Sequence, residues 1–167
     1  MKTNTLLSAC SCFLCFILIS GCDGDDNEFI ETGPEIEWIQ LGSAISYGYR
    51  SGVVSSYNFK RSFKVIKDSG EVEISLYKKG EKDNITTGTF IVENGKEYKV
   101  TVTAWISGRR TVNGSEDCFS VVFSSPNCRE NYEIAVPSFF VPSYNEWMPD
   151  MNYCPESFSF GEVVISQ

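Results

Sequence analysis

EYKVTVTAWI, at residues 97–106, decides the fold because apolar and polar side chains alternate along its length. Successive side chains of a β-strand point to opposite faces, so the alternation predicts a strand with one buried face. The expected buried set is Tyr98, Val100, Val102, Ala104 and Ile106. Trp105 interrupts the polar face, and we expect it to be either an exposed contact or a cover for a neighbouring sheet.

Shorter runs of the same kind lie on both sides of this strand. They are rich in Val, Ile, Thr and aromatic residues, and Gly, Asn, Asp and Lys turns separate them. No segment has a convincing helical period, so the pattern predicts an all-β chain folded as an antiparallel β-sandwich. Ser69-Gly70 predicts a tight hairpin turn between the third and fourth runs. The predicted runs are 36–41, 44–49, 59–65, 72–76, 87–92, 118–123, 132–141 and 158–165.

Residues 89–104, TFIVENGKEYKVTVTA, resemble the E-strand, turn and F-strand of a fibronectin type III or related immunoglobulin-like domain. In that family a turn containing Gly precedes a Tyr, and alternating Val and Thr follow it. The resemblance implies that Tyr98 is a tyrosine-corner residue whose hydroxyl hydrogen-bonds to nearby backbone. The chain lacks the family's early-strand Trp unless Trp38 serves, and it continues beyond the expected domain end. The implied fold is an immunoglobulin-like sandwich elaborated at the C-terminus.

The N-terminus has the features of a signal peptide. Lys2 precedes an apolar run at residues 6–20, which is shorter than the ~20 residues of a membrane-spanning helix. Ile19, Ser20-Gly21 and Cys22 then resemble the lipobox of bacterial lipoproteins. The resemblance implies cleavage before Cys22 and its modification with several acyl chains, such as palmitate, which anchor a protein firmly. The alternative is an ordinary secretory signal with a chance cysteine.

Residues 22–34 are polar and acidic, and we expect a flexible tether there. Four carboxylates follow Cys22 within six positions, which resembles the acidic export signal of Bacteroidetes-type surface lipoproteins. The resemblance implies the outer membrane, with the domain facing the cell exterior. The alternative is a solvated acidic tether that carries no export signal. Residues 35–167 have the length of a single domain.

Composition disfavours several function classes. The formal net charge of −8 argues against nucleic-acid binding, because an acidic protein repels phosphate backbones. The chain has no histidine, which removes Ser-His-Asp and Cys-His catalysis and His-based zinc sites. We predict no metal and no cofactor. We interpret two basic groups as solvated faces, namely Lys60, Arg61, Lys64 and Lys67, and the pair Arg109-Arg110.

Three cysteines remain beyond Cys22, and an exported protein permits disulfides. If the runs at 118–123 and 132–141 form a hairpin, Cys128 lies at its tip and Cys118 at its base. A strand of this length spans roughly 20 Å, too far for a bridge along it. Cys154 lies in the loop that starts at the base. This favours a Cys118–Cys154 disulfide with Cys128 free, and Cys128–Cys154 is the alternative.

The segment at residues 142–155, PSYNEWMPDMNYCP, is the candidate ligand-binding site. Its aromatic rings could stack on pyranose rings, and its polar side chains could hydrogen-bond to sugar hydroxyls. The candidate residues are Tyr144, Asn145, Trp147, Asp150 and Tyr153. One alternative is a structural cap that closes an end of the sandwich, and another is a surface for a partner protein.

The expected function is a lipid-anchored surface module that binds ligand or has a structural role, with a glycan as the candidate ligand of the segment at residues 142–155. The first alternative is protein–protein interaction or assembly at the outer-membrane surface. A second alternative is a glycan-degrading enzyme that uses Glu146 and Asp150 as an acid/base pair. These two carboxylates match no catalytic motif, so we do not expect an enzyme.

Overall fold

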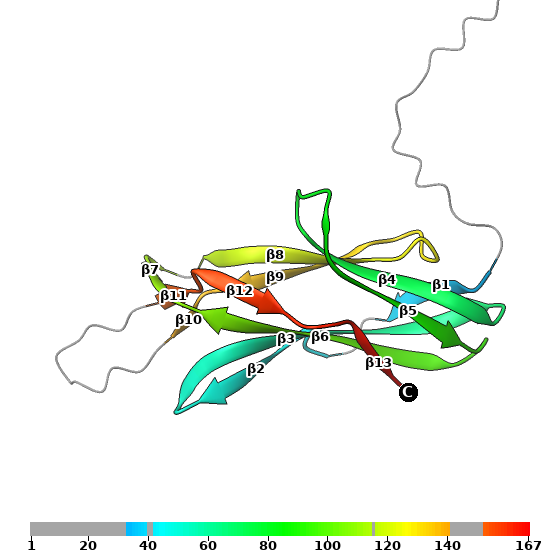
Figure 1. Cartoon of the computed structure of the whole chain (residues 1–167), viewed down its shortest axis with the longest axis horizontal. Coiled ribbons are helices and arrows are strands. Elements are labelled where there is room, and N and C mark those ends of the chain that lie inside the picture. The colour runs from blue at the N-terminus through cyan, green and yellow to red at the C-terminus, as the bar shows by residue number, and fades with distance from the viewer. Residues whose placement is uncertain (1–32, 40–41, 115, 141–151) are drawn as a thin grey trace, which may run out of the picture.

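The computed structural model describes residues 33–39, 42–114, 116–140 and 152–167. The regular elements in these ranges are β-strands, and all their pairings are antiparallel. They form two stacked sheets and a small third sheet at one end (Figure 1). The all-β antiparallel sandwich predicted from the alternating runs is therefore confirmed.

The first sheet is built around two long strands that pair with each other. Its strands are β1 (Glu35–Ile39), β2 (Ile45–Arg50), β3 (Val53–Lys67), β6 (Glu97–Ser107), β12 (Ser157–Phe160) and β13 (Val164–Ser166). β3 pairs with β6 at the centre. β1 and β2 pair with successive parts of β3 and form one edge, whereas β12 and β13 pair with β6 and form the other.

The second sheet covers the first, and the third sheet closes one end. The second sheet contains β4 (Gly70–Lys78), β5 (Asn84–Val92), β8 (Asp117–Ser124) and β9 (Tyr132–Pro137), in the order β5-β4-β8-β9. The third contains β7 (Arg110–Val112), β10 (Phe139–Phe140) and β11 (Asn152–Cys154), in the order β10-β11-β7. β9 and β5 form the edges of the second sheet.

The strand order is immunoglobulin-like. β1, β3 and β6 occupy the A, B and E positions of one sheet, and β5, β4, β8 and β9 occupy the C′, C, F and G positions of the other. β12 and β13 lie beside β6, where an immunoglobulin domain carries its D strand. The C-terminal residues thus elaborate the sandwich by filling an edge position.

Two local interpretations need correction. The Ser69-Gly70 turn does not close a hairpin, because β3 and β4 lie in different sheets and the chain crosses between them there. β5 and β6 also lie in opposite sheets, and in this strand order their connection corresponds to C′–E rather than E–F. The hydrogen bond predicted for Tyr98 is nevertheless present, because the backbone N–H of Glu93 donates to its hydroxyl at 3.0 Å.

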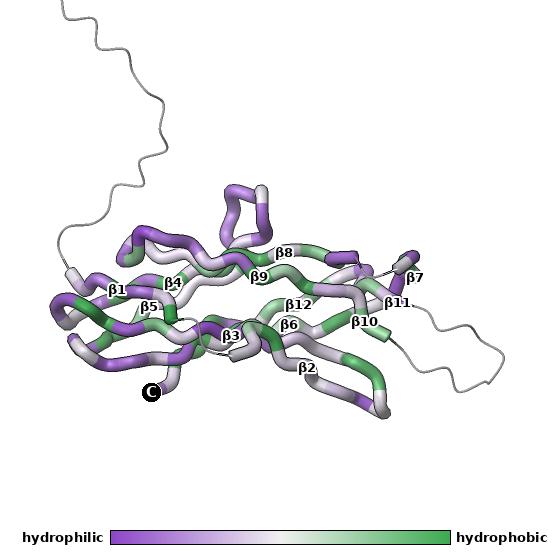
Figure 2. Tube along the Cα trace, turned by 180° about the vertical axis from the view of Figure 1, so that it is seen from behind, coloured by the Kyte–Doolittle hydropathy of each residue, from purple (hydrophilic) through white to green (hydrophobic). Residues whose placement is uncertain are grey.

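The hydrophobic core lies between the two large sheets. The apolar face predicted for β6 is buried from Tyr98 to Ala104, and Ile106 near the strand end is partly buried. Phe59 and Phe63 of β3 are fully buried, as are Val72, Ile74 and Leu76 of β4, and all five belong to one core cluster. Hydrophilic residues concentrate in several of the loops that join the strands (Figure 2).

Arg61 does not belong to a solvated basic face. It lies on the inward face of β3 with only 6% of its surface exposed, and its guanidinium carbon is 3.5 Å from the centroid of the Tyr132 ring. The alternation along β3 puts Arg61 on the same face as Phe59 and Phe63. The alternation therefore outweighs the preference of a charged side chain for solvent, and the Tyr132 ring stabilises the cation.

Replacing Tyr57 by phenylalanine should stabilise the protein. Its side chain is fully buried, and its hydroxyl has no hydrogen-bond partner among the residues that the structure describes. Burial, and to a lesser extent the nearby Tyr47, raises the pKa of this hydroxyl above its ordinary value. A buried polar group without a partner costs about 1–3 kcal/mol, so Tyr57→Phe should raise the free energy of unfolding by roughly 1 kcal/mol in urea titrations.

The matched control is Tyr98→Phe, which removes a hydroxyl that does accept a hydrogen bond. It should lower the free energy of unfolding by about 1 kcal/mol. A loss of stability in both variants would show that the Tyr57 hydroxyl also has a partner.

Candidate functional site

The third sheet holds both ends of the segment predicted to bind ligand. β10 ends at Phe140 and β11 begins at Asn152, and these two residues pair in the antiparallel ladder. β11 pairs in turn with β7, which follows directly after β6 through Gly108 and Arg109. The sheet therefore fixes where the candidate segment leaves the sandwich and where it returns.

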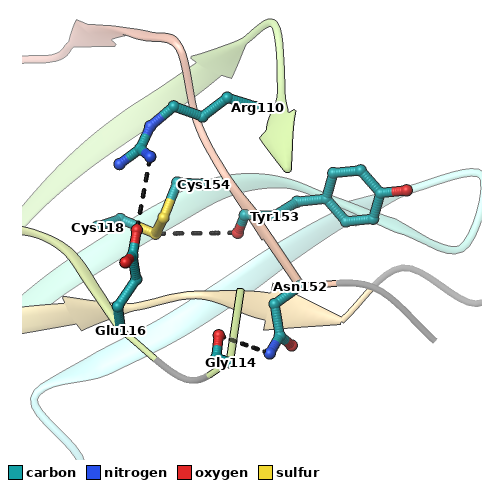
Figure 3. The surroundings of a disulfide bond; sticks show 7 residues. All are labelled: Arg110, Gly114, Glu116, Cys118, Asn152, Tyr153 and Cys154. Carbon is teal, nitrogen blue, oxygen red and sulfur yellow. Dashed lines mark hydrogen bonds and ion pairs between the residues drawn. A yellow bond between two sulfur atoms is a disulfide. The ribbon is translucent and has the colours of Figure 1, made fainter. Parts of the chain in front are cut away.

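The predicted disulfide between Cys118 and Cys154 is confirmed, with a Cα–Cα distance of 5.3 Å (Figure 3). It joins β8 of the second sheet to β11, and Cys154 is fully buried. Cys128 is free and partly buried in the connection between β8 and β9, as predicted. The hairpin geometry used to choose between the two pairings is thus correct.

Further contacts attach β11 to its surroundings. The Asn152 side-chain amide donates a hydrogen bond of 2.8 Å to the carbonyl of Gly114. Arg110 and Glu116 form an ion pair of 3.5 Å beside the disulfide, but both side chains are about half exposed, so its contribution is small (Figure 3). The disulfide and the amide hydrogen bond are therefore the stronger attachments.

Tyr153 is the one candidate ligand-binding residue that lies among the described residues. Its ring points away from the disulfide and packs against buried Phe139, with ring centroids 6.4 Å apart (Figure 3). Phe140 beside it is 49% exposed. The structure thus places two aromatic side chains at the base of the segment. The other candidates, Tyr144, Asn145, Trp147 and Asp150, lie outside the described residues, as do Glu146 and Cys22.

A hollow of about 540 Å³ lies next to the third sheet. The turn between β2 and β3 and the residues between β6 and β7 line it, with Arg50 and Arg109 among them. Arg109 directly precedes β7, so the hollow adjoins the end that carries the candidate segment. Its volume lies in the range of small-molecule sites.

A second cleft, of about 360 Å³, runs between the edge strands β2 and β9. Tyr47 lines it from the first sheet, and Tyr132 and Glu133 line it from the second. Glu133 is held by Lys79 at 2.9 Å, and this hydrogen bond lowers the pKa of the Glu133 carboxyl. Sequence reasoning missed the cleft because its two walls come from different sheets. The sequence signal that could have indicated it is the pair of tyrosines in the predicted run at residues 44–49.

Trp105 is exposed and does not cover a neighbouring sheet, since 52% of its surface is accessible. It pairs with Ser56 on one side and Ser159 on the other, so small residues flank the indole across the sheet. Gly161 lies beside the ring, where a Cβ atom would come within 3.2 Å of the indole. A larger residue at position 161 would therefore crowd the ring.

The described residues contain no helix that is long and apolar enough to cross a membrane. Nor do they contain a group of three or more Cys, Asp or Glu side chains that could hold a metal ion. No protein-family model, curated protein or solved structure matches the chain.

Proposed function

We propose that the protein is a lipid-anchored surface module that binds glycan at the end formed by β7, β10 and β11. The proposal rests chiefly on one observation: the small sheet and the Cys118–Cys154 disulfide hold Phe140, which precedes the candidate segment, and Asn152–Cys154, near its end, at one place. A binding segment with fixed ends loses less conformational entropy when it binds. Its aromatic and amide side chains suit the apolar faces and hydroxyls of sugars.

The position of this end suits a protein anchored at its N-terminus. β1 lies toward one end of the sandwich, and the third sheet lies at the other (Figure 1). A lipid on Cys22 would therefore connect to the sandwich far from the candidate site. In this arrangement the site faces away from the membrane and toward extracellular ligands.

The experiment is a glycan-array measurement on the soluble chain from Asp25 onward, with Trp147→Ala beside it. We expect saturable binding that Trp147→Ala weakens at least tenfold, because a stacked aromatic ring supplies much of the affinity at such sites. The melting temperature should not change. Trp105→Ala is the matched control, because it removes an exposed indole from another part of the sandwich.

Other outcomes would replace the proposal. Absence of glycan binding, together with a lower melting temperature for Trp147→Ala, would make residues 142–155 a structural cap. Glycan hydrolysis that is lost in Glu146→Gln or Asp150→Asn would make the protein an enzyme. The second candidate function, docking of a surface protein, is favoured by the exposed indole of Trp105. Crosslinking on cells that depends on Trp105 would support it.

A further inference from the structure

Two arginines from separate elements line the hollow next to the third sheet. Arg50 is the last residue of β2, and Arg109 lies between β6 and β7. Both residues are exposed, so a ligand can reach their guanidinium groups from solvent. The β2–β3 turn and the third sheet lie toward the same end of the sandwich (Figure 1). The hollow therefore places two accessible cations beside the end proposed to bind glycan.

The backbone next to each arginine has a tightly turned conformation. Ser51 and Gly52 join β2 to β3 as a two-residue hairpin loop, and both have positive φ angles, of 51° and 76°. Positive φ at both positions is the property of a type I′ turn, which fits the twist of the two strands. Gly108, with a φ of 69°, directly precedes Arg109. Arg50 and Arg109 thus extend from defined backbone positions on two sides of the hollow.

No carboxylate in the described part of the chain forms an ion pair with Arg50 or Arg109. Arg110 differs, because it pairs with Glu116 at 3.5 Å. The Glu156 carboxylate lies against the backbone just before Arg109, but it is not within pairing distance of either arginine. The chain as a whole has a formal charge of −8. Two cations without described counter-charges therefore make the hollow locally positive on an acidic protein.

We infer that this hollow binds the acidic group of a sugar, a carboxylate or a sulfate, and that the glycan ligand is therefore acidic. The inference rests on the proposed function, because the hollow adjoins the end that carries residues 142–155. A planar guanidinium matches an oxyanion through two parallel hydrogen bonds. Val54 and Ile106 add an apolar part to the lining, against which the ring carbons of a sugar can pack.

The test is isothermal titration of the purified full-length protein with D-glucuronate, D-glucose 6-sulfate and D-glucose, which share a ring and differ in the acidic group. At least one acid should bind roughly tenfold more tightly than glucose, and the tighter of the two identifies the group. Arg50→Gln/Arg109→Gln should abolish the difference. Lys64→Gln/Lys67→Gln is the matched control, because it removes two positive charges from the other end of β3. It should leave the preference unchanged.

Two outcomes would overturn the inference. One is equal binding of the three sugars, and the other is a preference for the acids that survives in Arg50→Gln/Arg109→Gln. Both arginines are exposed, so this variant should keep the melting temperature of the parent chain and remain testable.

Trp147→Ala separates the inference from the proposed function. It should weaken binding on the glycan array and leave binding of the single acidic sugar unchanged. Array binding that depends on Trp147 but shows no preference for acidic glycans would contradict the inference alone. Acid binding that depends on Arg50 and Arg109, without glycan binding that depends on Trp147, would contradict the proposed function alone.

Discussion

Removal of the Cys118–Cys154 disulfide should lower the free energy of unfolding by about 3–4 kcal/mol. The bridge spans 36 residues, and closing a loop of that length restricts the unfolded chain by roughly this amount. The native state also depends on the bridge, because β11 pairs through only a few residues with β7 and β10. Guanidinium titration of Cys118→Ser/Cys154→Ser against the parent chain measures the effect.

Cys128→Ser is the control for this experiment. Cys128 is free and partly buried, and burial raises the pKa of its thiol, so little thiolate is present to exchange with the bridge. The expected loss is below about 1 kcal/mol. If the double variant were as stable as the control, the small sheet alone would hold the C-terminal segment. The claim that the disulfide stabilises the candidate ligand site would then be wrong.

Strand positions could be predicted because they depend on local alternation. Glu97–Ser107 is a strand with the expected buried face, since every second residue is apolar over its whole length. The disulfide could be predicted because it follows from one hairpin and the rise per residue of a strand. Two predicted runs are each interrupted in the structure. Pro137 ends β9 because proline has no N–H for the ladder, and Gly161 follows the end of β12.

Sheet membership could not be predicted because it depends on which strands meet after the chain crosses the sandwich. The Ser69-Gly70 turn has the composition of a hairpin, but β1 and β6 flank β3, and β5 and β8 flank β4. The burial of Arg61 shows the same limit. The Tyr132 ring that makes its burial tolerable belongs to β9, far away in the sequence. The cleft between β2 and β9 and the hollow next to the third sheet are each formed by residues from separate elements, which no single stretch of sequence reveals.

Phe59→Ala should lower the free energy of unfolding by about 3–5 kcal/mol, the usual cost of removing a buried phenylalanine ring. Phe59 is fully buried at the centre of the sandwich. Its ring meets Phe119 of β8 edge-on at 6.1 Å and stacks on Phe160 of β12 at 6.5 Å. One side chain thus contacts the second sheet and the C-terminal edge strand together. Thermal and urea unfolding should both report the loss.

Lys60, next to Phe59 in the chain, supplies the control, because the face of β3 that a side chain occupies decides how much stability its removal costs. Lys60 lies on the opposite face of β3, so Lys60→Ala should change the free energy of unfolding by no more than about 0.5 kcal/mol. Phe59→Leu keeps most of the apolar volume and should cost less than Phe59→Ala. A large loss in Lys60→Ala with a small loss in Phe59→Ala would mean that the register of β3 is shifted by one residue. Such a shift would also bring Arg61 out to solvent.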